Sequence, residues 1–448
     1  MANNLKVGYA RVNINPPLGV NIAGYFKERL ADGILDDLEV CAVAAQSGDK
    51  TVLIMSVDNC GVHKSYLDDW RARIAERCGI DAEAIIIHST HTHQGPSLYV
   101  NLKNPLNVEY GVLVGHRVVD AAQMAIEDLK PAKMGIGVGE AKNVAFIRRY
   151  RMKDGTAKTN PGVNNPDIVS SIGETDERVN VVRFDREGGE TVVIANFGNH
   201  PDVVGGNKIS ADWPGMTRHI VEKCIDNTKC IVLNGAQGDV NHVNVHPKAG
   251  DFNDMFNDFD GCSRGYGHAR HIARVVTGAV MSVYDKVEWL DVESVRYTQK
   301  VVEIASNKAD PKDLPLAHKY NDLHLAGRDD EIPYKAMMLT TVVAAAARMV
   351  RLENAPDTFP MLFSAIAIGD IAFFGIPGEP FTGVGRGLKE AEGWKMVLPS
   401  CNTNAKEGYF PMKDSYDEGG YEAGTSNFKA GTAERIIEEG KAILASLR

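Results

Sequence analysis

The stretch IIIHSTHTHQGP, residues 85–96, decides how this sequence is interpreted. Three isoleucines predict a buried strand, and three histidines follow before a glycine and a proline end the segment. Catalytic residues favour the end of a buried strand, where the chain enters a loop. Side chains two apart in an extended segment point the same way, so His91 and His93 can converge on one metal, or on a metal and its substrate. Satisfied imidazoles at a polar strand end are the structural alternative.

The whole chain predicts interleaved strands and helices. Alternation and β-branched residues predict strands at residues 5–13, 38–46, 51–57, 84–88, 132–139, 179–185, 191–197, 229–234, 291–303, 361–367 and 370–376. Helical periodicity predicts helices at residues 63–77, 109–129, 214–225, 265–285, 333–352, 383–391 and 430–447. The interleaving lacks strict βαβ regularity. We therefore expect an α/β fold, with a mixed sheet covered by helices on both faces.

No linker divides the chain, so we expect a single catalytic domain over residues 1–448. Polar stretches at 154–180 and 242–267 are expected to be long loops. The net charge of −10 disfavours nucleic acids and anionic membrane surfaces as partners. No apolar run is long enough to span a bilayer, and the N-terminus has no apolar leader, so we expect a cytoplasmic protein. The sequence leaves the oligomeric state open, including a homo-oligomer.

The seven cysteines are scattered, odd in number and outside any CxxC motif. A disulfide framework and a structural zinc knuckle are therefore poorly supported, and reduced thiols are expected.

A further histidine, His200, follows the predicted strand 191–197 in the run FGNHP. Alone it would be read as structural, but beside the first histidine motif it becomes a candidate third nitrogen ligand. Asp212 then precedes Trp213 at the start of a predicted helix. Asp212 fits an N-cap and a site role equally well.

Three later segments also carry candidate chemistry. The run VLNGAQGDVN, residues 232–241, is a strand and a glycine-rich turn without the Gly-Lys-Ser/Thr of a phosphate loop. Glu379 lies between glycine and proline after an apolar strand. Tyr409 and Tyr421 can ligate a metal, stabilise an oxyanion or simply pack.

In this order, the segments resemble the neutral/alkaline, non-lysosomal ceramidase family. The family's opening strand and Gly-Tyr are similar to VGYARVNI, residues 7–14, and to residues 24–25. Its Thr-His-Thr-His-Ser-Gly-Pro block matches residues 90–96, with Gln94 in place of serine. Its later histidine, Gly-Asp-Val turn, Pro-Gly-Glu and pair of tyrosines match His200, residues 238–240, residues 377–379 and the two tyrosines. The similarity covers nearly the whole chain.

The resemblance implies a zinc-dependent hydrolase of an N-acyl amide bond that uses a metal-activated water. It implies one Zn²⁺ held by four side chains, His91, His200, Glu379 and Tyr409. It further implies that His93, Arg148 and Tyr421 surround the scissile carbonyl, with Arg149 as a competing match for the arginine. Two imidazoles and a carboxylate with an open position also suit catalytic zinc on chemical grounds. The expected fold is the ceramidase catalytic domain without the family's C-terminal immunoglobulin-like domain.

Three departures from the family affect the substrate. Asn241 replaces the serine after Gly-Asp-Val, which lies at the substrate head group in ceramidases. Residues 97–99, SLY, replace Gly-Gly-Tyr, and Trp213 with Pro214 replaces Asn-Lys. We therefore expect Asn241, Asp212 and Trp213 to shape the pocket. We expect the substrate to be a small-molecule or lipid-like N-acyl compound, with a place in sphingolipid metabolism as one option.

Several alternatives remain. A zinc-dependent esterase, lactonase or amidase with a soluble substrate, or a catalytically silent binding homologue, would keep the same residues. A metallo-β-lactamase-like site lacks its second metal motif, because Gln94 and Gly95 follow the histidine pair. A TIM-barrel amidohydrolase would need eight regular βα units, which are absent. A serine hydrolase would need a Gly-x-Ser-x-Gly elbow, which does not occur.

Overall fold

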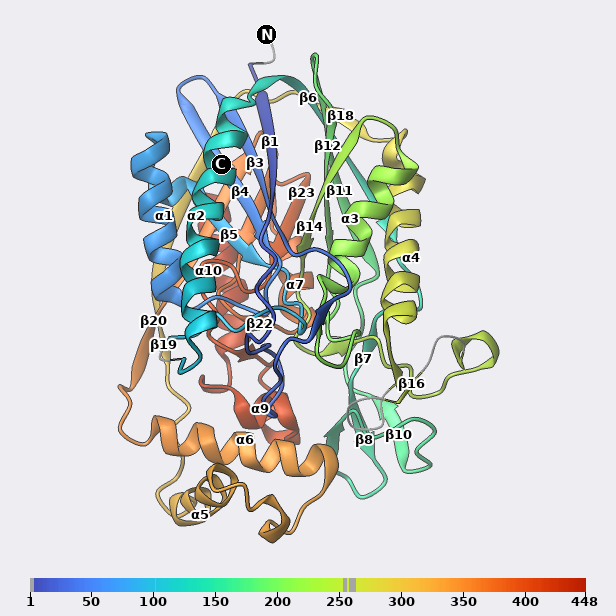
Figure 1. Ribbon diagram of the computed structural model, residues 1–448, viewed down its shortest axis with the longest axis vertical. Helices are drawn as coiled ribbons and strands as arrows, with labels where there is room; N and C mark the ends of the chain where they lie inside the picture. Colours follow the sequence, from blue (N-terminus) through green and yellow to red (C-terminus); the bar gives the residue numbers. More distant parts are fainter. Residues whose placement is uncertain (1–3, 101, 253–255, 258–262) are drawn as a thin grey trace.

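The computed structural model describes residues 4–100, 102–252, 256–257 and 263–448. Among these residues, nine strands form one large mixed sheet (Figure 1). Its path runs through β14 (Thr228–Asn234), β12 (Thr191–Phe197), β11 (Arg178–Arg186), β6 (Lys130–Glu140), β1 (Lys6–Asn13), β3 (Glu39–Ser47), β4 (Lys50–Val57) and β5 (Ile85–Ser89). β18 (Glu288–Leu290) pairs with β6 beside this path. Strands such as β5 are buried along their whole length because both faces of the sheet are covered.

The large sheet has two halves that meet at β1 and β6. These strands pair only where Lys6 meets Pro131 and Val7 meets Lys130, so the halves diverge beyond this point. The outermost pair in each half, β4 with β5 and β12 with β14, is parallel. In a parallel pair both strands end at the same edge, so each half presents two chain segments together at one edge of the sheet.

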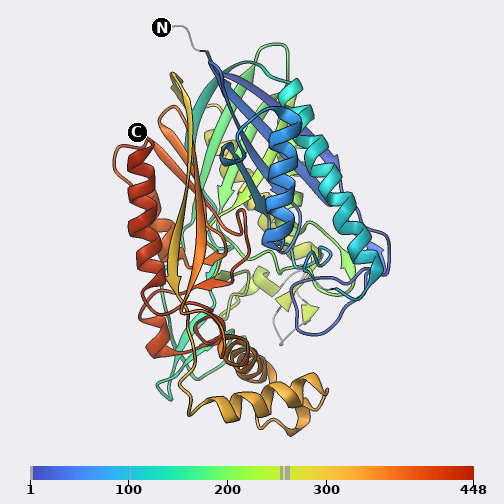
Figure 2. The ribbon, with the colours of Figure 1, turned by 90° about the vertical axis from the view of Figure 1, so that its left-hand side faces the viewer.

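A second, four-stranded sheet packs against the first. Its order is β19 (Val295–Ala305), β20 (Thr358–Ile368), β21 (Ile371–Gly375) and β23 (Met396–Ser400). Buried Ile366 and Phe373 share one hydrophobic core with Ile54 and Ile86 of the large sheet. Seen from the side, the four-stranded sheet lies between a C-terminal helix and the large sheet (Figure 2).

Helices cover the outer faces of both sheets. α1 (Lys64–Cys78) and α2 (Pro105–Glu127) pack on one half of the large sheet, and α3 (Asp212–Cys224) and α4 (Tyr266–Tyr284) on the other. The second sheet is covered by α7 (Thr382–Lys389) and α10 (Thr432–Ser446). At the far end lie α5 (Leu314–Leu325) and α6 (Ala336–Leu352), with α6 against α9 (Tyr421–Thr425) (Figure 1).

Short elements complete the described chain. They are β2 (Gly33–Ile34), β7 (Phe146–Ile147), β8 (Arg149–Met152), β9 (Ala157–Thr159), β10 (Ile168–Ser171), β13 (Lys208–Ile209), β15 (Val240–Asn241), β16 (Phe256–Asn257), β17 (Ser263–Arg264), β22 (Glu379–Pro380), β24 (Tyr409–Phe410), α8 (Ser415–Glu418) and the single 3₁₀ turns Ala82–Ala84, Ala249–Phe252 and Asp329–Glu331.

The expected α/β class with a mixed sheet covered by helices is confirmed. The helices cover one face of the large sheet and the second sheet covers the other, so the expectation of helices on both faces is wrong. Three local details differ from the predictions. The strand predicted at 291–303 corresponds to β19, which begins at Val295, and neither β18 nor α5 was predicted. The loop predicted at 154–180 contains β9 and β10, which flank β8 in a small sheet. Part of the predicted loop 242–267 lies outside the described residues.

Within the described ranges, no helix is both long enough and apolar enough to cross a membrane. The six cysteines in these ranges are free, and the seventh, Cys262, lies outside them.

Candidate metal centre

Three buried donor atoms converge where strands of both sheets end. His91 follows β5, His200 follows β12, and Glu379 follows β21. The Nε2 atom of His91 lies 3.2 Å from His200 Nε2 and 3.2 Å from Glu379 Oε2, and the latter two atoms are 3.8 Å apart. Tetrahedral zinc with bonds of about 2.0–2.2 Å places neighbouring ligand atoms about 3.3 Å apart. The three donors therefore already have the spacing that a zinc ion requires.

Main-chain carbonyls orient both imidazoles. Nδ1 of His91 lies 2.6 Å from the Cys60 carbonyl oxygen, and Nδ1 of His200 lies 3.2 Å from that of Gln237. A carbonyl can only accept a hydrogen bond, so each Nδ1 is assigned the proton and each Nε2 keeps a free lone pair. This outer-shell arrangement is typical of histidines that ligate a metal. The residues present therefore fit a divalent cation.

The three donor side chains differ in how their surroundings shift their pKa values. Burial lowers the pKa of His91, but the Glu379 carboxylate and the Cys60 side chain together outweigh this effect and raise the pKa to about 10. Burial lowers the pKa of His200 well below its usual value, and the positive charge of Arg148 acts in the same direction. Burial raises the pKa of Glu379, but His91 opposes it, and the net pKa lies well below the usual range. Glu379 is therefore ionised. A metal cation that replaces the extra proton of His91 is attracted by the same carboxylate.

The main chain at His91 is unusual. Its φ is 74°, in the left-handed region that residues with a Cβ rarely adopt. A hydrogen bond of 2.8 Å from His91 N to the Asn59 carbonyl holds it there. The extended His91–His93 segment expected from the sequence is thus wrong. Such local strain, imposed by the surrounding structure, is frequent at functional sites.

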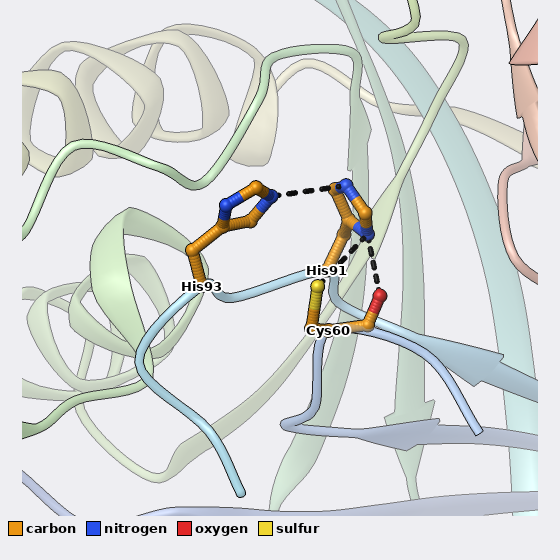
Figure 3. A group of neighbouring side chains, drawn as sticks. All are labelled: Cys60, His91 and His93. Atoms are coloured by element: carbon orange, nitrogen blue, oxygen red, sulfur yellow. Dashed lines mark hydrogen bonds between the residues drawn. The ribbon is translucent and has the colours of Figure 1, made fainter. Parts of the chain in front are cut away.

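His93 nevertheless approaches His91, as Figure 3 shows. The two Nε2 atoms are 3.3 Å apart. The His93 ring packs edge-on against Tyr25, and a Cβ at Gly24 would come within 2.6 Å of it. Burial lowers the pKa of His93, and no described residue hydrogen-bonds its buried Nδ1. Its imidazole is therefore fixed mainly by packing, with one nitrogen toward the donor cluster.

The structure separates the two neighbouring arginines. Arg148 Nε donates to Glu422 Oε1 at 2.7 Å, and Nη2 donates to the Gly238 carbonyl at 2.7 Å. Its Nη1 lies 3.5 Å from His200 Nδ1. Arg149 points elsewhere and donates to Ser415 Oγ at 2.8 Å. Arg148 is thus the arginine beside the donor cluster, as the sequence match placed it.

Both candidate tyrosines lie beside the same cluster. β22 and β24 pair in parallel and place Glu379 opposite Tyr409. The rings of Tyr409 and Tyr421 are 5.8 Å apart in an edge-to-face contact, and the Arg148 guanidinium lies 5.4 Å from the Tyr409 ring centre. Burial raises the pKa of both phenols, so both can donate a hydrogen bond. Tyr409 as a fourth metal ligand stays a prediction.

Comparison with known proteins gives a match in structure only. No protein-family model and no curated protein matches the sequence. The crystal structure of neutral ceramidase from Pseudomonas aeruginosa matches with a TM-score of 0.73 and 16% identity, over 100% of this chain and 75% of that chain. The chain has a neutral ceramidase-like fold. A structure described as ceramidase complexed with C2 also matches, with a TM-score of 0.72 and 15% identity, over 99% of this chain and 76% of that chain.

Within this neutral ceramidase-like fold, Asp212 and Trp213 are fully buried. Asp212 is the first residue of α3 and Ala211 is the N-cap, so the predicted N-cap is wrong by one position. The Asp212 carboxylate accepts from the main chain of Val203 at 3.0 Å and of Val204 at 2.9 Å, which ties the loop after His200 to α3. Trp213 packs edge-on against Phe197 in the core. A substrate role for either residue stays a prediction.

Asn241 is also buried, and its amide is used within the protein. Its Oδ1 accepts from Val243 N at 3.0 Å, and its Nδ2 donates to Asn160 Oδ1 at 3.1 Å. The predicted role at the substrate head group is neither supported nor opposed by these contacts.

Several residues of the site were not predicted. The Sγ atom of Cys60 lies 3.9 Å from His91 Nδ1 (Figure 3). It follows the end of the predicted strand 51–57, so the strand-end argument applied to the histidines also indicates this position. Glu422 directly follows Tyr421 and holds Arg148. Gln237, whose carbonyl oxygen orients His200, lies within the run 232–241 but was not itself named. Nothing local in the sequence marks Lys406, whose Nζ lies 3.5 Å from Cys60 Sγ.

Proposed function

We propose that this protein is a zinc-dependent hydrolase that cleaves an N-acyl amide bond. The arrangement of His91, His200 and Glu379 carries the proposal, because their donor atoms lie 3.2 to 3.8 Å apart and both imidazoles keep Nε2 free. Two histidines and a carboxylate with an open position are typical of catalytic zinc. The neutral ceramidase-like fold supports the amide as the bond cleaved.

Each surrounding residue has a task in this reaction. Zinc, when bound, supplies a Lewis acid that polarises the carbonyl and lowers the pKa of water. His93 Nε2 faces the donor cluster, where it accepts the proton of the attacking water and returns it to the leaving amine. Arg148, held by Glu422, and the Tyr421 hydroxyl supply donors to the oxyanion that forms on the carbonyl.

The finer features of the function are also proposals. We take the substrate to be an N-acyl compound with a lipid-like acyl chain and Tyr409 to complete the zinc shell. These proposals draw on the resemblance to ceramidases and on the site residues rather than on a bound ligand.

The test is hydrolysis by zinc-loaded protein. A short-chain fluorescent ceramide and a set of soluble N-acyl amides, esters and lactones are incubated with it, and acid release is followed. Chelator-treated protein and His91→Ala run alongside. Amide cleavage that both controls abolish supports the proposal. Zinc bound at one per chain without cleavage of any amide overturns it, and cleavage of esters or lactones alone assigns the site to those bonds.

A further inference from the structure

A second group of metal-binding side chains lies beside the donor cluster. One donor atom each from Cys60, His91 and His93 lies within 4.8 Å of the other two, and all three side chains are buried (Figure 3). Cys60 follows β4 and both histidines follow β5, so the group forms where two neighbouring strands end. It offers a thiol and two imidazoles, whereas the donor cluster offers two imidazoles and a carboxylate. The two groups therefore offer different chemistry to an ion.

The two groups share one nitrogen atom. Nδ1 of His91 lies 2.6 Å from the Cys60 carbonyl oxygen, so Nε2 carries the lone pair that either group can use. This Nε2 lies 3.3 Å from His93 Nε2 and 3.2 Å from His200 Nε2. Two nitrogen ligands of one tetrahedral ion lie about 3.3 Å apart, so either histidine can bind an ion together with His91. One lone pair binds one ion at a time, and occupation of one group therefore excludes the other.

The sulfur of Cys60 is available to an ion. Lys406 Nζ lies 3.5 Å from Cys60 Sγ, and a positive charge at this position stabilises the thiolate, the form of cysteine that ligates metals. Nδ1 of His91 lies 3.9 Å from the sulfur but is already bonded to the Cys60 carbonyl oxygen. Lys406 Nζ also donates to the Tyr99 hydroxyl at 2.5 Å, which keeps a partner for the ammonium when an ion binds the sulfur.

The thiolate decides which ions the second group prefers. Thiolate ligands favour soft cations, whereas imidazole and carboxylate ligands with an open position are typical of catalytic zinc. We propose that Cys60, His91 and His93 form a second metal site, which takes thiophilic cations such as cadmium and copper(I) and cannot be filled together with the donor cluster.

Occupation of this second site has a consequence for the reaction. Its ion binds His93 Nε2, the atom proposed to accept the proton of the attacking water, and it also removes His91 from the zinc ligands. Thiophilic cations are therefore expected to stop hydrolysis. The loss of hydrolysis rests on the proposed function, but the binding of the ion does not.

The first test is titration of metal-free protein with cadmium, followed by the ultraviolet charge-transfer band that a cadmium–thiolate bond produces. Wild type, Cys60→Ser and the matched control Cys41→Ser are compared after melting temperatures show that all three are folded. Cys41 is also buried but lies within β3. We expect the first equivalent of cadmium to give the band in wild type and in Cys41→Ser, and Cys60→Ser to lose it.

The second test asks whether the two sites exclude each other. Cadmium is added to zinc-loaded wild type, and an indicator dye measures the zinc released. We expect one zinc per chain to be released as the thiolate band appears. Glu379→Gln removes a ligand of the donor cluster only, so this variant should keep the cadmium–thiolate band.

Three results would overturn the inference. Equal bands from wild type and Cys60→Ser would assign the cadmium to other cysteines, and cadmium bound without a band would place it in the donor cluster. Zinc that stays bound while the band appears would show that the sites do not share His91. If the zinc-loaded protein cleaves no amide, the hydrolase proposal fails, and the thiolate band still decides this inference.

Discussion

His88 and His91 lie three residues apart, yet their ring nitrogens are used differently. Nδ1 of His88 lies 2.6 Å from the Cys401 carbonyl oxygen, and its Nε2 accepts from Asn234 N at 2.9 Å. Both nitrogens therefore connect main-chain segments. His91 uses only Nδ1 in this way and presents Nε2 to the donor cluster. One histidine serves the fold, and the other serves the site.

This difference predicts opposite results for two alanine variants. We expect His91→Ala to fold but to bind zinc more weakly. Its zinc affinity should fall by more than the roughly 10- to 100-fold that is typical when an outer-shell residue is replaced. We expect His88→Ala to keep zinc but to lose about 1–3 kcal/mol of stability, because Asn234 N–H is left buried without an acceptor. Zinc content and urea unfolding measure both. Equal loss of zinc from the two variants would contradict the assignment.

The buried pair of Arg148 and Glu422 predicts a stability pattern. Arg148→Met removes the cation closest to the Glu422 carboxylate and leaves it Thr159 and, at 4.0 Å, Arg149, which costs up to about 3–5 kcal/mol. We expect Arg148→Met/Glu422→Gln to regain most of that stability while hydrolysis stays lost, because the oxyanion donor is still missing. Denaturant unfolding and turnover of the same samples provide the readouts. Activity that returns together with stability would leave Arg148 a purely structural role.

Asp212 predicts a pH effect on stability. Burial raises its pKa to about 7, although main-chain donors act against the rise. In the unfolded chain the pKa is near 3.9, so between about pH 4 and 7 the folded state holds a proton that the unfolded state lacks. Its contribution to stability therefore falls as pH rises through this window. We expect wild type to lose stability relative to Asp212→Asn over that range in urea unfolding, and a constant difference would refute the shift.

At the residue scale, motifs named in advance several residues that the structure brings together. The sequence match gave Arg148 with Arg149 as a competing match, and the structure places Arg148 next to His200. The histidine pair marked the strand end where the three donor atoms converge. The left-handed main chain at His91 could not be foreseen, because it depends on a hydrogen bond to Asn59 across the fold. The placement of Lys406 beside Cys60 depends on the contact of two distant loops in the same way.

At the scale of elements, the site depends on where strands end. β5 and β14 belong to the large sheet and β23 to the second sheet, yet their ends are joined by main-chain hydrogen bonds. Ser89 N donates to the Asn402 carbonyl at 3.1 Å, and Cys401 N donates to that of Asn234 at 3.0 Å. Apolar runs predicted each strand individually. Which ends meet is a non-local property that no single run encodes.

The helix α5 shows why one element escaped prediction. Among its residues only Ala317 is buried, so there is no apolar face to produce a helical period. The helices α1, α2, α3, α4 and α6 each bury several residues and were predicted with small errors at their ends.

Two glycines in different elements predict opposite outcomes for the same change. A Cβ at Gly238 would come within 2.6 Å of the Glu379 carbonyl oxygen, so Gly238→Ala displaces the main chain of a predicted ligand. We expect a loss of about 1–3 kcal/mol and weaker zinc binding. In α4, a Cβ at Gly278 meets nothing within 4 Å, so Gly278→Ala gains up to about 1 kcal/mol. Thermal unfolding and zinc titration compare the pair, and undisturbed zinc binding in Gly238→Ala would contradict the first expectation.

At the scale of the whole molecule, one hydrophobic core joins both sheets. The interleaved pattern predicted the α/β class because each strand and helix carries its own period. The division into two sheets was not predicted, since a strand that is apolar on both faces carries no mark of its partner. The candidate metal centre lies where strand ends of both sheets meet. Its donor atoms therefore come together only when the two sheets are packed against each other.

Zinc should therefore stabilise the whole fold. A ligand that binds only the folded state adds about 2.7 kcal/mol when its free concentration is a hundred times its Kd. We expect a chelator to lower the melting temperature of zinc-loaded wild type and to leave that of His91→Ala unchanged. Scanning calorimetry with and without chelator gives the comparison, and the same decrease in both proteins would point to a different metal site.

The order of synthesis follows from the positions of the donors along the chain. His91 and His200 emerge from the ribosome before Glu379 and the opposing Tyr409, which lie much farther along the chain. The two histidines must wait without their carboxylate until the segment that contains Glu379 has been made. Capture of the proposed zinc ion therefore follows the synthesis of Glu379, and chains that terminate before this residue cannot retain the ion through this centre.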